Sequence, residues 1–160
     1  MILHVKGSNK AVRRLIETAA WFYAEKLMGK RLMESLEITI NLKRGMLEKT
    51  GNEATAIWED DNVRPKEFTI DIDSGVNLRN LLITLAHEMV HVKQWAKDEM
   101  YEYTNMAGLV RFKGEKGHME ITEYWAGTVM RFLSWMNHLM MVLKFVMSAE
   151  QKQKKTLYIL

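Results

Sequence analysis

The sequence predicts an α+β fold in which helices pack against a small β-sheet. Three regions show the three- and four-residue apolar spacing of amphipathic helices, and three short regions alternate apolar and polar residues as strands do. The predicted order is an N-terminal helix, a three-stranded sheet, a long central helix and C-terminal helices. With 160 residues, 48% of them hydrophobic, the chain can bury one sizeable core. We therefore expect a single domain over residues 1–160, with its core in 1–150 and a basic tail in 151–160.

The first predicted helix begins near Ser8, a suitable N-cap residue, and runs to Gly29, a residue type that commonly ends helices. Its apolar residues recur at helical intervals and would share one face. They are Val12, Leu15, Ile16, Ala19, Phe22, Tyr23 and Leu27. This face is expected to pack on the sheet.

Three strands are predicted after this helix. Leu36–Leu42 and Phe68–Asp73 alternate apolar and polar residues, so each should bury one face. Ala54–Trp58 is shorter, and we expect it at an exposed sheet edge near the functional site, where an extended peptide could pair with it. The composition of Gly45–Asn52 indicates a turn, and that of Asp60–Lys66, which holds the single proline, indicates a loop.

The long central helix is predicted from about Leu78 to Lys97, with Asn77 as its N-cap. The run HEMVH, residues 87–91, lies in its middle. A looser segment follows, with a short strand at Leu109–Lys113. Helical spacing then resumes near Met119 and continues, with one break, to about Ser148.

The run HEMVH has the spacing of a metal site. Residues four apart project from the same helix face, so His87 and His91 can offer two imidazoles to one ion. Glu88 is rotated by about 100° from His87, so its carboxylate can lie beside the ion without binding it. Zinc lowers the pKa of a bound water to about 7, and Glu88 could take the proton of that water. Because the chain has no cysteine, only His, Asp or Glu can complete the site. We therefore predict Zn²⁺ as cofactor, with Glu88 as the catalytic base.

A catalytic zinc site needs a third protein ligand. The stretch GHMEITEYWAG offers three candidates, of which Glu120 is preferred, while Glu123 and His118 stay as alternatives. Glu120 and Glu123 are three residues apart and would share a helix face, so one could bind zinc while the other accepts a hydrogen bond from a ligand imidazole.

With HEMVH followed by a later acidic helix, the chain resembles the zincin metallopeptidases. The longer run TLAHEMVHVKQWAKDEM is similar to SprT-like and related metallopeptidases of phages and bacteria, and the likeness covers about residues 68–131. The resemblance implies a minimal zincin-like domain that hydrolyses peptide bonds with a zinc-activated water. It also places Glu120 where that family has the first glutamate of a closing helix. SprT-like proteins more often use a histidine as third ligand, which keeps His118 open.

Two other functions stay open at this point. A fourth protein ligand would make this a non-catalytic binding module with structural zinc, or the chain could be an interaction protein with a peptidase-like fold. The expected partner is a protein or peptide substrate, because a net charge of +3 gives only weak support for nucleic acid. Trp95 and Trp125 are interpreted as packing residues, with a place beside the cleft as the alternative.

We expect a cytoplasmic protein without a membrane span. Charged and polar residues interrupt the long apolar region 128–147, and their spacing predicts an amphipathic helix. The start of the chain lacks the order of a secretory signal, and the absence of cysteine fits a reducing compartment. The sequence leaves the oligomeric state open.

Overall fold

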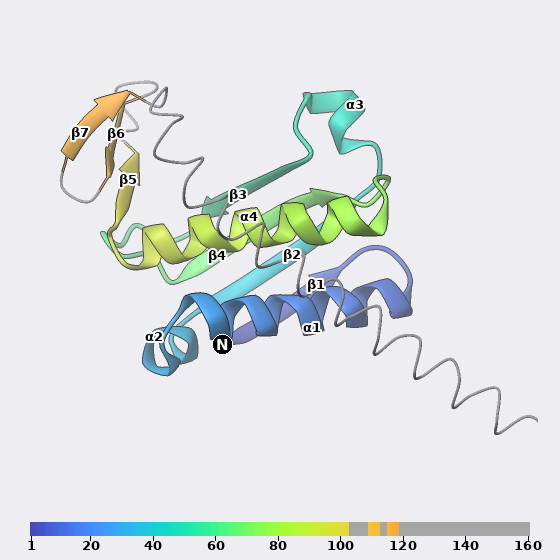
Figure 1. Ribbon diagram of the computed structural model, residues 1–160, viewed down its shortest axis with the longest axis horizontal. Helices are drawn as coiled ribbons and strands as arrows, with labels where there is room; N and C mark the ends of the chain where they lie inside the picture. The colour runs from blue at the N-terminus through green and yellow to red at the C-terminus, as the bar shows by residue number, and fades with distance from the viewer. Residues whose placement is uncertain (103–108, 113–114, 119–160) are drawn as a thin grey trace, which may run out of the picture. The chain divides into compact units, whose positions relative to one another are not determined.

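The computed structural model describes residues 1–102, 109–112 and 115–118, all of which belong to one compact unit, Met1–Glu120 (Figure 1). These ranges contain four helices, a four-stranded sheet and a second sheet of three strands. The predicted mixed α+β class is confirmed. The predicted number of strands in the main sheet is wrong, because that sheet has four strands and not three.

The main sheet has the strand order β1-β2-β4-β3. Strands β1 (Ile2–Lys6), β2 (Glu37–Lys43) and β4 (Glu67–Asp73) are parallel, whereas β3 (Ala54–Trp58) pairs antiparallel with β4. The three predicted strands correspond to β2, β3 and β4. The expectation that Ala54–Trp58 forms an edge of the sheet is confirmed.

Strand β1 was not predicted. It pairs with β2 over five residues, from Ile2 opposite Glu37 to Lys6 opposite Asn41. At this edge of the sheet every second residue is exposed and the residues between them are only half-buried. Ile2 and Leu3 are both apolar and lie on opposite faces, so this five-residue stretch has no clear alternation, which explains why the sequence pattern alone did not reveal the strand.

Helix α1 covers Lys10–Leu27, slightly less than predicted. Its N-cap is Asn9 and not Ser8, because Asn9 Oδ1 accepts a backbone N–H from the first turn at 3.0 Å. Ser8 has a φ of +55°, outside the extended conformation that an N-cap residue adopts. Gly29 does not end α1 but is the N-cap of a second, unpredicted helix, α2 (Lys30–Glu34).

The region predicted as a turn, Gly45–Asn52, contains a short helix, α3 (Met46–Thr50). The glycines that flank it have φ values of +73° and +77°, which few other residues adopt at low cost. From the end of β4, the Asp73 carboxylate accepts the backbone N–H groups of Gly45 at 3.1 Å and Leu47 at 2.8 Å. This helix therefore depends on a cap from a distant part of the chain, which a local pattern cannot predict.

Helices α1 and α4 (Leu78–Ala96) lie on the same face of the main sheet (Figure 1). The strand residues on that face are buried at alternate positions: Ile38, Ile40 and Leu42 on β2, and Phe68, Ile70 and Ile72 on β4. The bounds of α4 agree with the prediction, and Asn77 is its N-cap, since its side chain accepts the backbone N–H of Asn80 at 3.0 Å. The core thus lies between the sheet and the helix that carries HEMVH.

A second, antiparallel sheet of order β5-β6-β7 follows α4. Strand β6 (Leu109–Phe112) confirms the short strand predicted near this position. Its neighbours β5 (Met100–Glu102) and β7 (Glu115–His118) were not predicted. In this segment the sequence pattern located one strand and missed its two partners.

Several predictions fall outside the described residues. They are the helical region from Met119 to Ser148, the tail 151–160 and the role of Trp125. The single-domain organisation likewise stays a prediction. Among the residues that the structure describes, no helix has the length and apolar character needed to cross a membrane.

Candidate metal centre

Packing of α4 fixes the position of HEMVH. The buried apolar residues of this helix include Leu81, Leu82, Leu85, Met89 and Val92, which is the face the periodicity predicted. From α1, the hydroxyl of Tyr23 donates a hydrogen bond to the backbone carbonyl of Leu82 at 3.3 Å, and burial raises the pKa of that hydroxyl to about 12. The middle of α4 is therefore held on the core, and His87 and His91 remain partly accessible.

The side chains of His87 and His91 point toward one another. Their Nε2 atoms are 3.0 Å apart, and their rings meet edge to face with centroids 4.7 Å apart. Two zinc–nitrogen bonds of about 2.0–2.1 Å at a tetrahedral angle would separate the nitrogens by roughly 3.3 Å. A small rotation of either ring would allow both nitrogens to bind one ion, so this donor pair fits zinc.

Burial lowers the pKa of both imidazoles. For His91 the pKa falls to about 4, first because the ring is desolvated and second because His87 is close by. The pKa of His87 is lowered by desolvation. Both rings are therefore neutral near pH 7, which is the protonation state that binds metal ions.

Glu88 follows His87 on α4 and is buried, with 7% of its surface exposed. No described residue donates a hydrogen bond to its carboxylate, and desolvation raises its pKa to about 7. A carboxyl group with a pKa near 7 can both accept and release a proton at neutral pH. These are the properties that a general base requires.

Aromatic rings continue from His91 toward the sheet edge. Trp95, one helical turn after His91, stacks on the imidazole at 5.4 Å with an interplanar angle of 25°. Trp58 on β3 meets the Trp95 ring edge to face at 5.1 Å, so β3 contacts the helix that carries HEMVH. Trp95 is 6% exposed, which confirms its interpretation as a packing residue. The role of Trp58 was missed, since only a contact between distant segments reveals it.

The third ligand stays a prediction. Glu120 and Glu123 lie outside the described residues, and His118 is described only as the last backbone position of β7. Within residues 1–102 and the described parts of the second sheet, no group of three or more His, Cys, Asp or Glu side chains gathers in a metal-binding arrangement. The structure thus brings together the side chains of His87 and His91 from the predicted site, and Glu88 follows His87 on the same helix.

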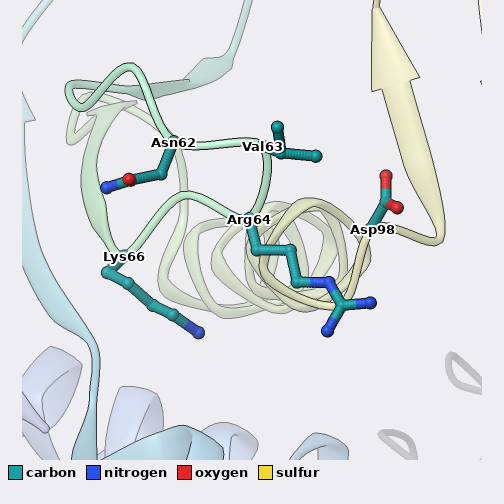
Figure 2. Close-up of a pocket in the computed structure, with 5 residues that line it drawn as sticks. All are labelled: Asn62, Val63, Arg64, Lys66 and Asp98. Carbon is teal, nitrogen blue, oxygen red and sulfur yellow. The ribbon is translucent and has the colours of Figure 1, made fainter.

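A cavity of about 590 Å³ lies between the β3–β4 loop and the segment that follows the C-terminal end of α4 (Figure 2). Its described lining consists of Asn62, Val63, Arg64, Lys66 and Asp98. The Asp98 carboxylate is paired with Arg111. None of these lining residues belongs to HEMVH, so the cavity is separate from the histidine pair.

The described site consists of two neutral, converging imidazoles and a buried carboxyl group, all carried by one helix. Its chemistry follows from these residues alone. Comparison with protein-family models, with curated proteins and with solved structures finds no match to this chain.

Proposed function

We propose that this chain is a zinc-dependent peptidase with a minimal zincin-like arrangement. His87 and His91 would bind the metal, and Glu88 would act as general base. The observation that carries the proposal is the 3.0 Å approach of the two Nε2 atoms on a helix that also buries the carboxyl group of Glu88. Glu120 is the proposed third ligand, with Glu123 and His118 as alternatives. A cytoplasmic location and a protein or peptide substrate belong to the same proposal.

When bound, zinc supplies a Lewis acid and lowers the pKa of a water molecule. His87 and His91 would bind the ion as neutral nitrogen donors, and their lowered pKa values keep them neutral at pH 7. Glu88 accepts the proton of the attacking water and returns it to the leaving amine, so the carboxyl group ends the cycle as it began.

We propose that the substrate binds along strand β3. This strand forms an edge of the main sheet, and Trp58 at its end contacts the helix that carries the histidines. An extended peptide could add to this edge through backbone hydrogen bonds and would then run beside HEMVH. We therefore expect cleavage of unfolded chains in preference to folded domains.

The alternative is a non-catalytic module with structural zinc, or an interaction protein with a peptidase-like fold. Neither gives a role to Glu88. Burying a carboxylate without a hydrogen-bond donor disfavours its charged form, and a structural metal site gains nothing from it. The position and surroundings of Glu88 therefore favour the enzyme.

The test compares wild type with Glu88→Gln, which keeps the size of the side chain but cannot act as a base. We expect zinc content to be unchanged and cleavage of fluorescently labelled casein to fall by about 10² or more, the scale of general-base catalysis. Glu25→Gln makes the same change at an exposed position on α1 and should leave both unaffected. Equal cleavage by wild type and Glu88→Gln, with zinc retained, would refute the peptidase assignment.

A further inference from the structure

We propose that Trp95 is a positioning residue that fixes the ring of His91, and that Trp58 braces Trp95 from the edge strand. The role of this unit in metal binding rests on the function proposed above. The positioning itself rests on ring contacts that are independent of any metal.

The first contact is between Trp95 and His91. The two residues are four apart on α4, so they project from the same face one turn from each other. Their rings are nearly parallel, at 25°, with centroids 5.4 Å apart. A flat indole surface against the imidazole face opposes rotation of that ring. Such rotation would turn Nε2 of His91 away from Nε2 of His87, now 3.0 Å away.

Trp95 is itself held on two other sides. Phe68 on β4 stacks on it at 6.3 Å with an angle of 11°, and Trp58 on β3 meets it edge to face at 5.1 Å. The indole N–H of Trp95 is buried and, among the described residues, has no hydrogen-bond acceptor. Because tryptophan N–H groups usually find an acceptor when buried, burial of this one has a cost in hydrogen bonding. The ring is therefore held by its surface, and its flat area is what the site uses.

The contacts join two parts of the site that lie far apart in the sequence. Trp58 belongs to the strand proposed to pair with substrate, and His91 belongs to the metal ligands. One tryptophan, Trp95, touches both. Partners that orient metal-ligating histidines are ordinarily hydrogen-bond acceptors, and their loss weakens metal affinity by about 10- to 100-fold. His91 has a side-chain hydrogen bond with Gln94, and ring stacking by Trp95 adds a second restraint on the orientation of its imidazole.

The first experiment measures affinity for cobalt(II) by visible absorbance, with zinc as competitor, in three variants. Trp95→Leu removes the flat ring and should weaken metal binding by about tenfold or more. Trp95→Phe retains a flat ring and should restore most of the affinity. Ile38→Ala removes a buried side chain from β2, a strand separated from β3 by β4, and should lower stability but not affinity. Wild-type affinity in Trp95→Leu, or an equal loss in Ile38→Ala, would overturn the proposal.

The second experiment separates this proposal from the proposed function. In metal-free protein, the ring protons of His91 can be followed by NMR, because the face of Trp95 shifts them. We expect that shift to disappear in Trp95→Leu and His91 resonances to average over several ring orientations. A wild type that binds no metal would refute the proposed function, yet this spectrum would still decide the positioning. Unchanged His91 resonances in Trp95→Leu would overturn it.

Trp58→Leu provides the same test at a half-exposed position, where folding is less at risk. It should disturb the His91 resonances less than Trp95→Leu does, because it loosens Trp95 without removing it. If Trp95→Leu does not fold, Trp58→Leu decides the question. Identical His91 spectra in wild type and Trp58→Leu would then refute the brace.

Discussion

Two buried carboxyl groups, Asp73 and Glu88, lie on adjacent elements and have opposite environments. Asp73, at the end of β4, accepts backbone N–H groups from Gly45, Leu47 and Gly75, at distances between 2.7 and 3.1 Å. These hydrogen bonds lower its pKa. Glu88, on α4, has no such donor among the described residues, and desolvation raises its pKa to about 7.

The difference separates a carboxylate that stays charged from a carboxyl group that exchanges a proton near pH 7. Asp73 is 3% exposed and Glu88 is 7% exposed, so burial alone does not distinguish them. What differs is the number of donors that each meets. A carboxylate with three donors keeps its charge to lower pH than usual and organises the chain around it. One without donors sits near the pH at which it can exchange a proton, which is unfavourable for stability and useful for catalysis.

The largest expected effect concerns the metal, which should depend on the HEMVH region and not on Asp73. We expect about one zinc per chain in wild type. His87→Ala and His91→Ala should each remove most of it, because two protein ligands hold zinc poorly. Asp73→Asn should keep it. The zinc content of the purified proteins is the measurement. Full zinc content in the variant that combines His87→Ala and His91→Ala would refute the proposed zinc site.

The next effect is the pH dependence of stability in metal-free protein. The pKa of Glu88 is raised from 4.5 to about 7 by folding. Its protonated form therefore supports folding fully below pH 4.5, and this support is lost as pH rises through 7. The loss amounts to roughly 3 kcal/mol, at about 1.4 kcal/mol per pH unit.

Glu88→Gln cannot titrate, so the stability of wild type relative to this variant should fall by that amount between pH 4.5 and 8. His91, whose pKa is lowered to about 4, has the opposite trend, with stability lost as pH falls below 6.5. Because both proteins contain His91, the difference isolates Glu88. Urea denaturation across this range measures it, and a constant difference would show that Glu88 is not buried as described.

The smallest expected effect is on stability alone. Asp73→Asn should lower the thermal midpoint at pH 7, because the backbone N–H groups around Asp73 lose a charged acceptor. Since folding lowers the pKa of Asp73, its contribution is present above pH 3.8 and disappears as pH falls further. The gap between the two melting curves should therefore close in acid. Asp61→Asn, at an exposed position in the β3–β4 loop, serves as the control.

Helices and strands whose apolar spacing is clear in the sequence were predicted correctly. Alternation located β2 and β4, and helical spacing with an Asn77 cap located α4 and so the position of HEMVH. Helix α3 was missed because its cap, Asp73, lies 26 residues from Leu47 in the chain. In the candidate site, the spacing of His87 and His91 predicted their convergence. The contact of Trp58 with Trp95 could not be foreseen, because it depends on the position of β3 beside α4.

The strand order has a consequence for how the chain folds. Strands β3 and β4 are joined by a short loop and can pair early, whereas each parallel pair must wait for an intervening helix or strand to form a crossover. Closing such long loops slows folding, so we expect the parallel pairs to form late. Helix α4 follows β4 directly in the chain, so it is synthesised after every strand of the main sheet. Because packing on this sheet holds the helix that carries both histidines, we expect metal uptake to follow folding of the sheet instead of directing it.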